Sequence, residues 1–172
     1  MGNLNFIYPE IFICLSIMFL LLLGVFKKES TNLVYNLSTV TLLGTLALIV
    51  NYPINSESSL FNFSYKIDYL STYMKILTVL GGIFIMIISS RYLKILKIFK
   101  IEYPILILSS ILGMIVMISS NDLIVFYIGL ELQSLALYVL ASFNRDQLKS
   151  SESGLKYFVL SALSSGLLLY GC

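Results

Sequence analysis

Three ionisable side chains lie within long apolar stretches of this 172-residue chain: Glu131, Lys156 and Lys75. A charge at the centre of a bilayer costs at least about 2.5–3.5 kcal/mol on insertion scales, so an ionisable group inside a membrane segment is a candidate functional residue. Chains of such groups are also what proton paths through membranes are built from. These three residues are therefore the candidate proton-path residues, with Lys75 the weakest of them.

Glu131 is the clearest candidate because it lies deep in its apolar stretch. It follows Leu123 by eight residues, which is about 12 Å along a helix. The hydroxyls of Tyr127, Ser134 and Tyr138 share its helical face, so this face is expected to meet another helix or a water-filled cavity rather than lipid. Two interpretations remain open. Glu131 is either a proton relay whose charge follows a movable cation, or a fixed partner in an ion pair or interhelical hydrogen bond, for which Tyr127 or Tyr138 would also serve.

The two lysines lie nearer the ends of their apolar stretches. A lysine near a helix end ordinarily extends its ammonium group to the interface. This snorkelled position is the favoured interpretation for Lys75. For Lys156, which has Asp146 and Glu152 nearby in the chain, a snorkelled position and a place on a proton path both remain open.

The other acids fall at the starts of apolar stretches. Asp68 precedes one stretch and Asp122 another, and both are expected to cap the N-terminus of a helix, where the helix dipole favours a carboxylate. Glu10, beside Pro9, is likewise interpreted as a residue of a helix terminus.

Several kinds of chemistry are missing from the chain. It has no histidine and only two cysteines, so the common zinc, haem and Ser–His sites are excluded. Cys14 and Cys172 both lie in apolar stretches and are expected to be small buried hydrophobes. No glycine-rich phosphate loop follows a strand-like segment. We therefore expect no metal, no cofactor and no nucleic-acid partner for this chain.

The composition predicts an all-α integral membrane protein. Hydrophobic residues make up 58% of the chain, charged residues only 12%, and the mean hydropathy is +0.93. A helix needs about 20 apolar residues to cross the hydrocarbon core. Six segments meet or approach this length, and they are predicted to be transmembrane helices: Ile7–Phe26, Leu33–Val50, Tyr69–Ser90, Tyr103–Ser119, Leu123–Phe143 and Ser153–Cys172.

The connections between these segments predict the topology. Residues 120–122 leave room only for a tight turn, so the fourth and fifth helices are expected to be antiparallel neighbours. Residues 51–66 are polar and contain Pro53, which is typical of a surface loop. The connections after helices one, three and five carry nearly all the loop lysines and arginines, which places them on the inner side and the N-terminus outside. These residues are Lys27, Lys28, Arg91, Lys94, Lys97, Lys100, Arg145 and Lys149. The run from Arg91 to Lys100 can also be interpreted as an anchor for lipid headgroups.

Two stretches of sequence resemble a known family. Asn121–Leu140, which contains GLELQSLALYVL, and Ser151–Gly166, which contains GLKYFVLSALSSG, are similar to chain 2 of respiratory complex I, the NADH:ubiquinone oxidoreductase. The similarity extends back through Asp68, Lys75 and Ser89–Leu93. It implies an antiporter-like fold of about fourteen helices built on two inverted five-helix repeats. It also implies that the subunit has no redox cofactor and takes part in proton translocation.

The resemblance carries over to residues and to partners. Glu131 matches the family's intramembrane glutamate of helix five, and Lys156 matches the lysine of helix six. Residues 1–102 correspond to helices one to three, and 103–172 to helices four to six, which begin the first repeat. The later helices are missing, and with them the helix-seven lysine that pairs with the helix-five glutamate. A second, C-terminal polypeptide from a split gene is therefore expected, beside other membrane-arm subunits and membrane lipids.

The cellular location follows from composition and family together. Abundant Ile, Phe, Tyr, Asn and Lys with scarce Ala and Arg are the bias of an AT-rich genome, as in many organelles, so the expected site is the mitochondrial inner membrane with the N-terminus on the intermembrane-space side. Two alternatives remain. The chain is a structural piece without its own proton path, or it belongs to a plastid NDH-like complex or a multi-subunit cation/proton antiporter.

Overall fold

The computed structural model describes residues 7–26, 31–51, 58–60, 64–96 and 98–171, with only the backbone for 58–60. Lys27, Lys28, Pro53, Lys97 and Cys172, on which some expectations fall, lie outside the described residues. The elements are α1 (Tyr8–Phe26), α2 (Thr31–Asn51), β1 (Ser58–Leu60), β2 (Tyr65–Ile67), α3 (Tyr69–Ile95), α4 (Glu102–Ile118), α5 (Leu123–Ala141) and α6 (Leu148–Gly171).

The six predicted helices are confirmed, and two of them are longer than expected. α3 continues to Ile95 and α6 begins at Leu148, each five residues beyond the apolar stretch that predicted it. The additional turns carry Arg91, Lys94 and Lys149. Such residues end an apolar window, but a helix need not end where it leaves the hydrocarbon, because its backbone hydrogen bonds are internal.

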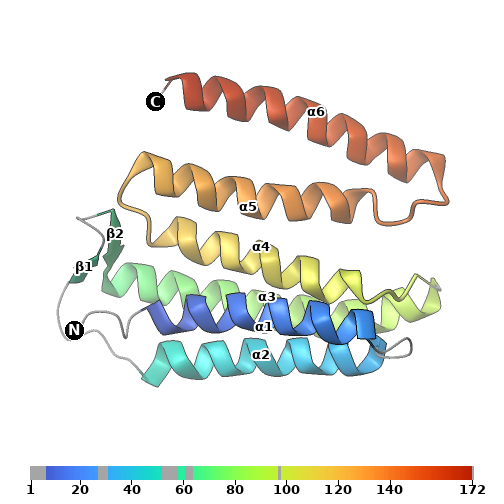
Figure 1. Ribbon diagram of the computed structural model, residues 1–172, viewed down its shortest axis with the longest axis horizontal. Coiled ribbons are helices and arrows are strands. Elements are labelled where there is room, and N and C mark those ends of the chain that lie inside the picture. The colour runs from blue at the N-terminus through green and yellow to red at the C-terminus, as the bar shows by residue number, and fades with distance from the viewer. Residues whose placement is uncertain (1–6, 27–30, 52–57, 61–63, 97, 172) are drawn as a thin grey trace.

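The helices run alternately up and down in layers (Figure 1). α1, α2, α3 and α4 pack against one another as a four-helix bundle, α5 packs on α4, and α6 packs on α5. The start of α1 and the end of α6 lie at the same end of the molecule, and the β-hairpin lies there too (Figure 1). The antiparallel packing of α4 and α5 is as predicted.

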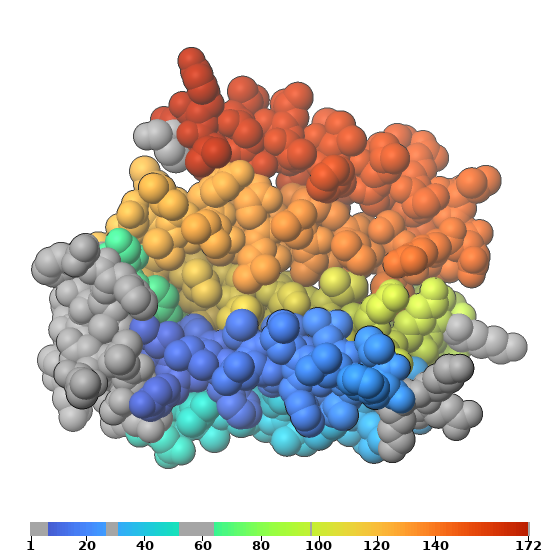
Figure 2. All heavy atoms as spheres, viewed as in Figure 1, coloured from blue at the N-terminus to red at the C-terminus, as the bar shows by residue number. Residues whose placement is uncertain are grey.

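The hydrophobic core lies within α1 to α4. Its fully buried side chains interlock from all four of these helices, and no residue of α5 or α6 belongs to it. α6 has a single buried residue, Gly154. In Figure 2 this helix forms the outermost layer on one side of the molecule. The core residues are Ile13, Leu20, Val34, Tyr35, Leu42, Ile49, Val79, Met86, Ile105, Ile107, Leu108, Ile111 and Ile115.

α4 and α5 approach so closely that their backbones touch at two glycines. A Cβ atom on Gly113 would lie 2.8 Å from the carbonyl oxygen of Gly129, and one on Gly129 would lie 3.0 Å from that of Gly113. Small residues that let backbones meet are a common device for packing helices in membranes, where no hydrophobic effect drives helices together. This contact fixes the position of α5, and thus of Glu131 two residues further on.

Residues 51–66 were expected to form a surface loop, and the structure corrects this in part. β1 and β2 form an antiparallel hairpin with Ser58 opposite Ile67. The hairpin is attached to the α4–α5 turn, since the Lys66 amide donates to the Ser119 carbonyl at 2.9 Å and the Asn121 amide to the Ser64 carbonyl at 3.0 Å. Tyr65 is only 8% exposed. The polar composition of this segment concealed the alternation of buried and partly exposed residues in β2.

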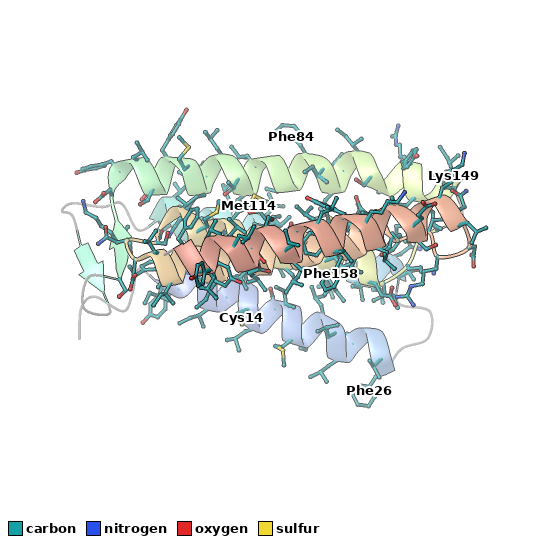
Figure 3. All side chains as sticks on the ribbon, turned by 90° about the horizontal axis from the view of Figure 1, so that it is seen from above. Cys14, Phe26, Phe84, Met114, Lys149 and Phe158 are labelled. Atoms are coloured by element: carbon teal, nitrogen blue, oxygen red, sulfur yellow. The ribbon has the colours of Figure 1, made fainter. Side chains whose placement is uncertain are left out.

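The outer faces of the helices are apolar. Within the part of the chain that the structure describes, α1, α2, α3 and α5 are long and apolar enough to cross a membrane, and α4 is a shorter apolar helix of 17 residues. α6 has 24 residues but opens on polar turns. Large hydrophobic side chains such as Phe84 point away from the bundle (Figure 3). Cys14, expected to be buried, is exposed on α1, so it faces lipid or a partner.

Candidate functional site

Glu131 lies in the middle of α5 on the face that meets α6. It is seven residues, about two turns, before Tyr138, which is buried against α6 and shares its helical face. The Tyr138 hydroxyl hydrogen-bonds to Ser161 of α6, and its ring packs edge-on against Tyr157 and Phe158. As the sequence predicted, this face is turned toward another helix rather than lipid.

The carboxylate of Glu131 has no partner within the described residues. Its Oε1 is buried and accepts no hydrogen bond, and the carboxylate joins none of the ion pairs seen between described residues. The backbone carbonyl, not the side chain, accepts the Ser134 hydroxyl at 3.0 Å. Tyr138, one of the two expected tyrosine partners, is bonded to α6 instead. A buried polar atom without a hydrogen bond is costly, and Glu131 Oε1 is such an atom among the described residues.

Lys156 lies on the surface of α6. Its ammonium group pairs with Glu152, one turn earlier, at 2.6 Å, and the two side chains are 68% and 62% exposed. Exposed ion pairs of this kind contribute little to stability. The described residues therefore leave Lys156 on an open face of the molecule, in company with one of the acids noted near it in the sequence.

The structure does not bring Glu131 and Lys156 together. α5 and α6 are antiparallel, and the contacts of Tyr138 with Ser161 and of Ser142 with Gly154 define their register. In this register Lys156 lies opposite the end of α5, about nine to twelve residues beyond Glu131. At 1.5 Å per residue, the two are separated by roughly 14–18 Å along the helix axis.

Lys75 is buried, and the snorkelled position expected for it is wrong. Its Nζ lies 2.7 Å from Oε1 of Glu10 on α1 and 3.0 Å from the Tyr65 hydroxyl on β2. The Lys75 and Glu10 side chains are only 5% and 8% exposed. The ammonium also lies 5.1 Å from the centre of the Tyr65 ring. We refer to Glu10, Tyr65 and Lys75 as the hairpin-end triad.

The triad has two donors for one carboxylate oxygen. The Tyr65 hydroxyl donates to Glu10 Oε1 at 2.7 Å, beside the Lys75 bond to the same atom. Burial, and then the nearby charge of Glu10, raise the pKa of the Tyr65 hydroxyl above its ordinary value, so it keeps its proton and remains a donor. Oε2 of Glu10 is buried and has no hydrogen-bond partner among the described residues.

Sequence reasoning missed the triad. Glu10 was interpreted as a terminus residue; it does lie in the first turn of α1, but its side chain points inward and is buried. Its partner is 65 residues away, and Tyr65 belongs to a hairpin that was not predicted. The available signal was the pair of opposite charges in the first two turns of two apolar helices, Glu10 in α1 and Lys75 in α3. The other two acids behave as expected, since Asp68 and Asp122 are the N-cap residues of α3 and α5.

The described residues contain no group of three His, Cys, Asp or Glu side chains able to hold a metal ion. The ionisable groups inside the bundle thus fall into two sets at different places, the unpaired Glu131 and the paired triad. Both consist of side chains that carry or bind protons, and neither contains a nucleophile of the kind used in soluble hydrolases.

Comparison with known proteins gives a consistent family. A family model described as NADH:quinone oxidoreductase/Mrp antiporter, transmembrane, matches residues 120–172. NADH-quinone oxidoreductase subunit N of Pelagibacter ubique is 77% identical over 172 residues, which is 100% of this chain and 36% of that protein. Subunit N of Maricaulis maris is 48% identical over 98% of this chain and 35% of its own length. The chain thus spans about a third of the length of these relatives.

The fold agrees with this result. A chain of respiratory complex I from Thermus thermophilus, in a structure with bound aureothin, superimposes with a TM-score of 0.78 at 25% identity, over 95% of this chain and 35% of that one. The resemblance predicted from the segments around Glu131 and Lys156 is confirmed. The relatives named above are bacterial proteins.

Proposed function

We propose that this chain, related over its whole length to the N-terminal part of the antiporter-like subunit N of NADH-quinone oxidoreductase, takes part in proton translocation driven by quinone reduction. The chain would be a membrane-arm component of a complex with NADH:quinone reductase activity. It would have no redox centre of its own, in line with a chain that has no histidine and only two cysteines. NADH oxidation and quinone reduction would then take place on other subunits.

The observation that carries this proposal is the unpaired carboxylate of Glu131. An apolar residue at this depth would be less costly, and its own chain supplies no cation for it within the described residues. A carboxylate of this kind gains a proton when no cation is near and loses it when one approaches. Glu131 would therefore be the proton-carrying group, with a lysine from the later helices of subunit N as its movable partner.

The open faces of α5 and α6 support a partner. Almost all of α6 is exposed, including Leu160, Leu163 and Leu167, because this helix contributes no residue to the hydrophobic core of the described part of the chain. We propose that the remaining helices of subunit N cover this surface, either on a second polypeptide or on a continuation of this one. Other membrane-arm subunits would then enclose the assembly.

Location and orientation are proposed from charge and from the relatives. The described basic residues Arg91, Lys94, Lys100, Arg145 and Lys149 lie in the connections after α3 and α5 or in the adjoining turns, which favours the inner side of the membrane for this end. The N-terminus would then be outside. Since the relatives are bacterial, a bacterial energy-converting membrane is better supported than the mitochondrial inner membrane expected from composition.

The two lysines receive different roles. Lys75 has a carboxylate and a hydroxyl within 3.0 Å, so it would hold its proton in a fixed pair rather than pass it on. Lys156 has only an exposed glutamate as its partner, and its side chain is free to turn toward a helix that covers α6. Lys156 is thus proposed as a second proton-path residue, one that acts at the inner end of the path.

The test is Glu131→Gln in the assembled complex. Glutamine keeps the shape and the hydrogen-bonding groups but does not titrate. Proton uptake per NADH oxidised, measured in inverted vesicles, should fall while assembly is retained, and Glu131→Asp should retain part of the pumping. Glu102→Gln, the same change at a carboxylate that is 57% exposed and pairs with Arg145, is the matched control and should pump normally. Normal pumping by an assembled Glu131→Gln enzyme would make Glu131 structural.

The second candidate function is a structural wedge that holds neighbouring antiporter-like units together without conducting protons. The observation in its favour is the extent of the hydrophobic core of α1 to α4, to which Glu131 on α5 does not contribute. The family model also covers cation/proton antiporters, but the relatives named as subunit N favour complex I.

A further inference from the structure

A polar cavity of about 390 Å³ opens between α2 and α3 at the end of the bundle opposite the hairpin. The first turns of α2 contribute Asn32, Tyr35, Asn36 and Thr39, the end of α3 contributes Ile87, Ser90, Arg91 and Lys94, and Phe99 closes the group. Amide, hydroxyl and cationic groups therefore converge on one space. The cavity is remote from both Glu131 and the triad.

The floor of the cavity is formed by side chains that are packed and hydrogen-bonded within the bundle. Tyr35 is 5% exposed, its hydroxyl donates to the Met86 carbonyl, and its ring packs against Phe99 at 5.3 Å. Lys94 lies over the Phe99 ring, with its Nζ 5.2 Å from the ring centre. This arrangement holds the lysine over the cavity wall by a cation–π contact.

Within the described part of the chain, Arg91 and Lys94 have no acidic partner. Neither Arg91 nor Lys94 joins any of the ion pairs formed by described residues, and the nearby acid Glu102 pairs with Arg145. The two adjacent positive charges repel each other, because no carboxylate of the described residues compensates them. An anion bound in the cavity would offset that repulsion. The side-chain amides of Asn32 and Asn36 add donors able to hydrogen-bond to a phosphate. The hydroxyls of Thr39 and Ser90 already donate to backbone carbonyls of their own helices.

The level of the cavity is that of lipid headgroups. α3 has 27 residues, about 40 Å at 1.5 Å per residue, whereas the hydrocarbon core is about 30 Å thick. Arg91 and Lys94, at its C-terminal end, therefore lie beyond the hydrocarbon. Below them the outer faces of the same two helices carry exposed apolar side chains, among them Val40, Phe84 and Ile87, along which acyl chains can lie.

From this geometry we propose that the cavity binds the phosphate of an anionic phospholipid, with Arg91 and Lys94 as its charge partners. The lipid would fill the space between α2 and α3 on the inner leaflet and tie the two helices together at this end. A free phosphate ion would use the same charges but not the apolar faces, which is why a lipid is the preferred occupant.

The experiment uses the assembled complex in vesicles that contain a phosphatidylglycerol with a photoreactive group near its headgroup. After illumination, adducts are mapped by mass spectrometry of peptides. We expect adducts within residues 32–39 and 87–94, and competition by unlabelled phosphatidylglycerol but not by phosphatidylcholine or inorganic phosphate. Each removed charge should weaken binding about five-fold, so R91Q/K94Q should weaken it roughly 30-fold.

The controls separate charge recognition from misfolding. Arg91→Lys with Lys94→Arg keeps both charges and should keep most of the adduct yield at unchanged assembly. Lys149→Gln removes an exposed charge from the same end of the molecule (Figure 3) and should not alter it. Equal adduct yields in R91Q/K94Q and the unchanged chain would overturn the proposal, as would competition by phosphatidylcholine. Displacement by inorganic phosphate would overturn the lipid as occupant in favour of a free anion.

Discussion

At the scale of single residues, the ionisable groups inside the bundle differ in whether the chain itself satisfies them. Lys75 and Glu10 satisfy each other, with Tyr65 as a third member, whereas Glu131 has no described partner. The Lys75 and Glu10 side chains are only 5% and 8% exposed, whereas Glu131 is partly buried. The charges of the pair compensate each other within the chain, while the Glu131 carboxylate can still take a cation as its partner.

The first prediction concerns the hairpin-end triad. Lys75→Met leaves the Glu10 carboxylate buried without a cation, and breaking a buried pair in this way costs about 3–5 kcal/mol. The variant should dissociate from the solubilised complex at a lower temperature than the unchanged chain. Because E10Q/K75M contains no buried charge, it should recover most of the loss. Tyr65→Phe, which removes one donor, should cost only about 1–3 kcal/mol.

The matched control is Lys66→Met. Lys66 pairs with Asp68 at 3.0 Å, but the two side chains are 40% and 34% exposed, so this change should cost no more than about 1 kcal/mol. If Lys75→Met were as stable as the control but lost proton pumping, Lys75 would belong to the proton path and the fixed-pair assignment would fail.

At the scale of elements, apolar length and composition were enough to predict all six helices. The N-caps at Asp68 and Asp122 were also predictable, because an aspartate directly before an apolar stretch is a preferred N-cap residue. The β-hairpin was not, since its strands are only three residues long and one of them depends on docking to the α4–α5 turn. Likewise, the burial of Lys75 follows from a contact with α1 that no local pattern contains.

The glycine contact between α4 and α5 gives the second prediction. Gly129→Ala places a methyl group against the backbone of α4, where a Cβ atom would lie only 2.8 Å from the Met117 nitrogen. The helices must separate, at a cost of about 1–3 kcal/mol, and Glu131 moves with α5. We expect a lower dissociation temperature and reduced pumping in the same variant.

Gly81→Ala is the control for this change. A Cβ atom on Gly81 meets nothing within 4 Å, and alanine is favoured over glycine within a helix by about 0.5–1 kcal/mol. This variant should therefore be as stable as the unchanged chain or slightly more so. Equal effects of the two substitutions would mean that the close approach at Gly129 has no energetic importance.

At the scale of the whole molecule, the six helices form a compact four-helix bundle and a two-helix extension. α4 belongs to the same core as α1 to α3, so the packing shows no break at residue 102, where the resemblance leads us to expect the start of the repeat. The extension carries Glu131 and Lys156, and the bundle carries the triad and the basic cavity. The proposed proton-path residues thus lie on the part of the molecule with the fewest contacts of its own.

The orientation of the molecule is the third prediction. In a chain with its native cysteines replaced by serine, a cysteine at Asn144 should react with a membrane-impermeant thiol reagent only from the inner side. A cysteine at Asn51, at the opposite end of the bundle and exposed, should react only from the outer side. The physical reason is the excess of basic residues at the Asn144 end. The reverse pattern of labelling would invert the assignment.

The last prediction concerns the surface of α6. Leu163 is 66% exposed and Phe84 on α3 is 64% exposed, yet the two face different surroundings, because α4 and α5 lie between their helices (Figure 1). Helices associate in a membrane only through close packing and polar contacts, and α6 exposes Ser164 and Gly166 for both. A photoreactive residue at Leu163 should therefore form an adduct with the polypeptide that holds the later helices of subunit N. The same group at Phe84 should give adducts with lipid or with another subunit, but not with those helices. If Leu163 reacted only with lipid, or if the isolated chain proved to be a stable monomer, α6 would be an outer surface and Glu131 would have to find its cation elsewhere.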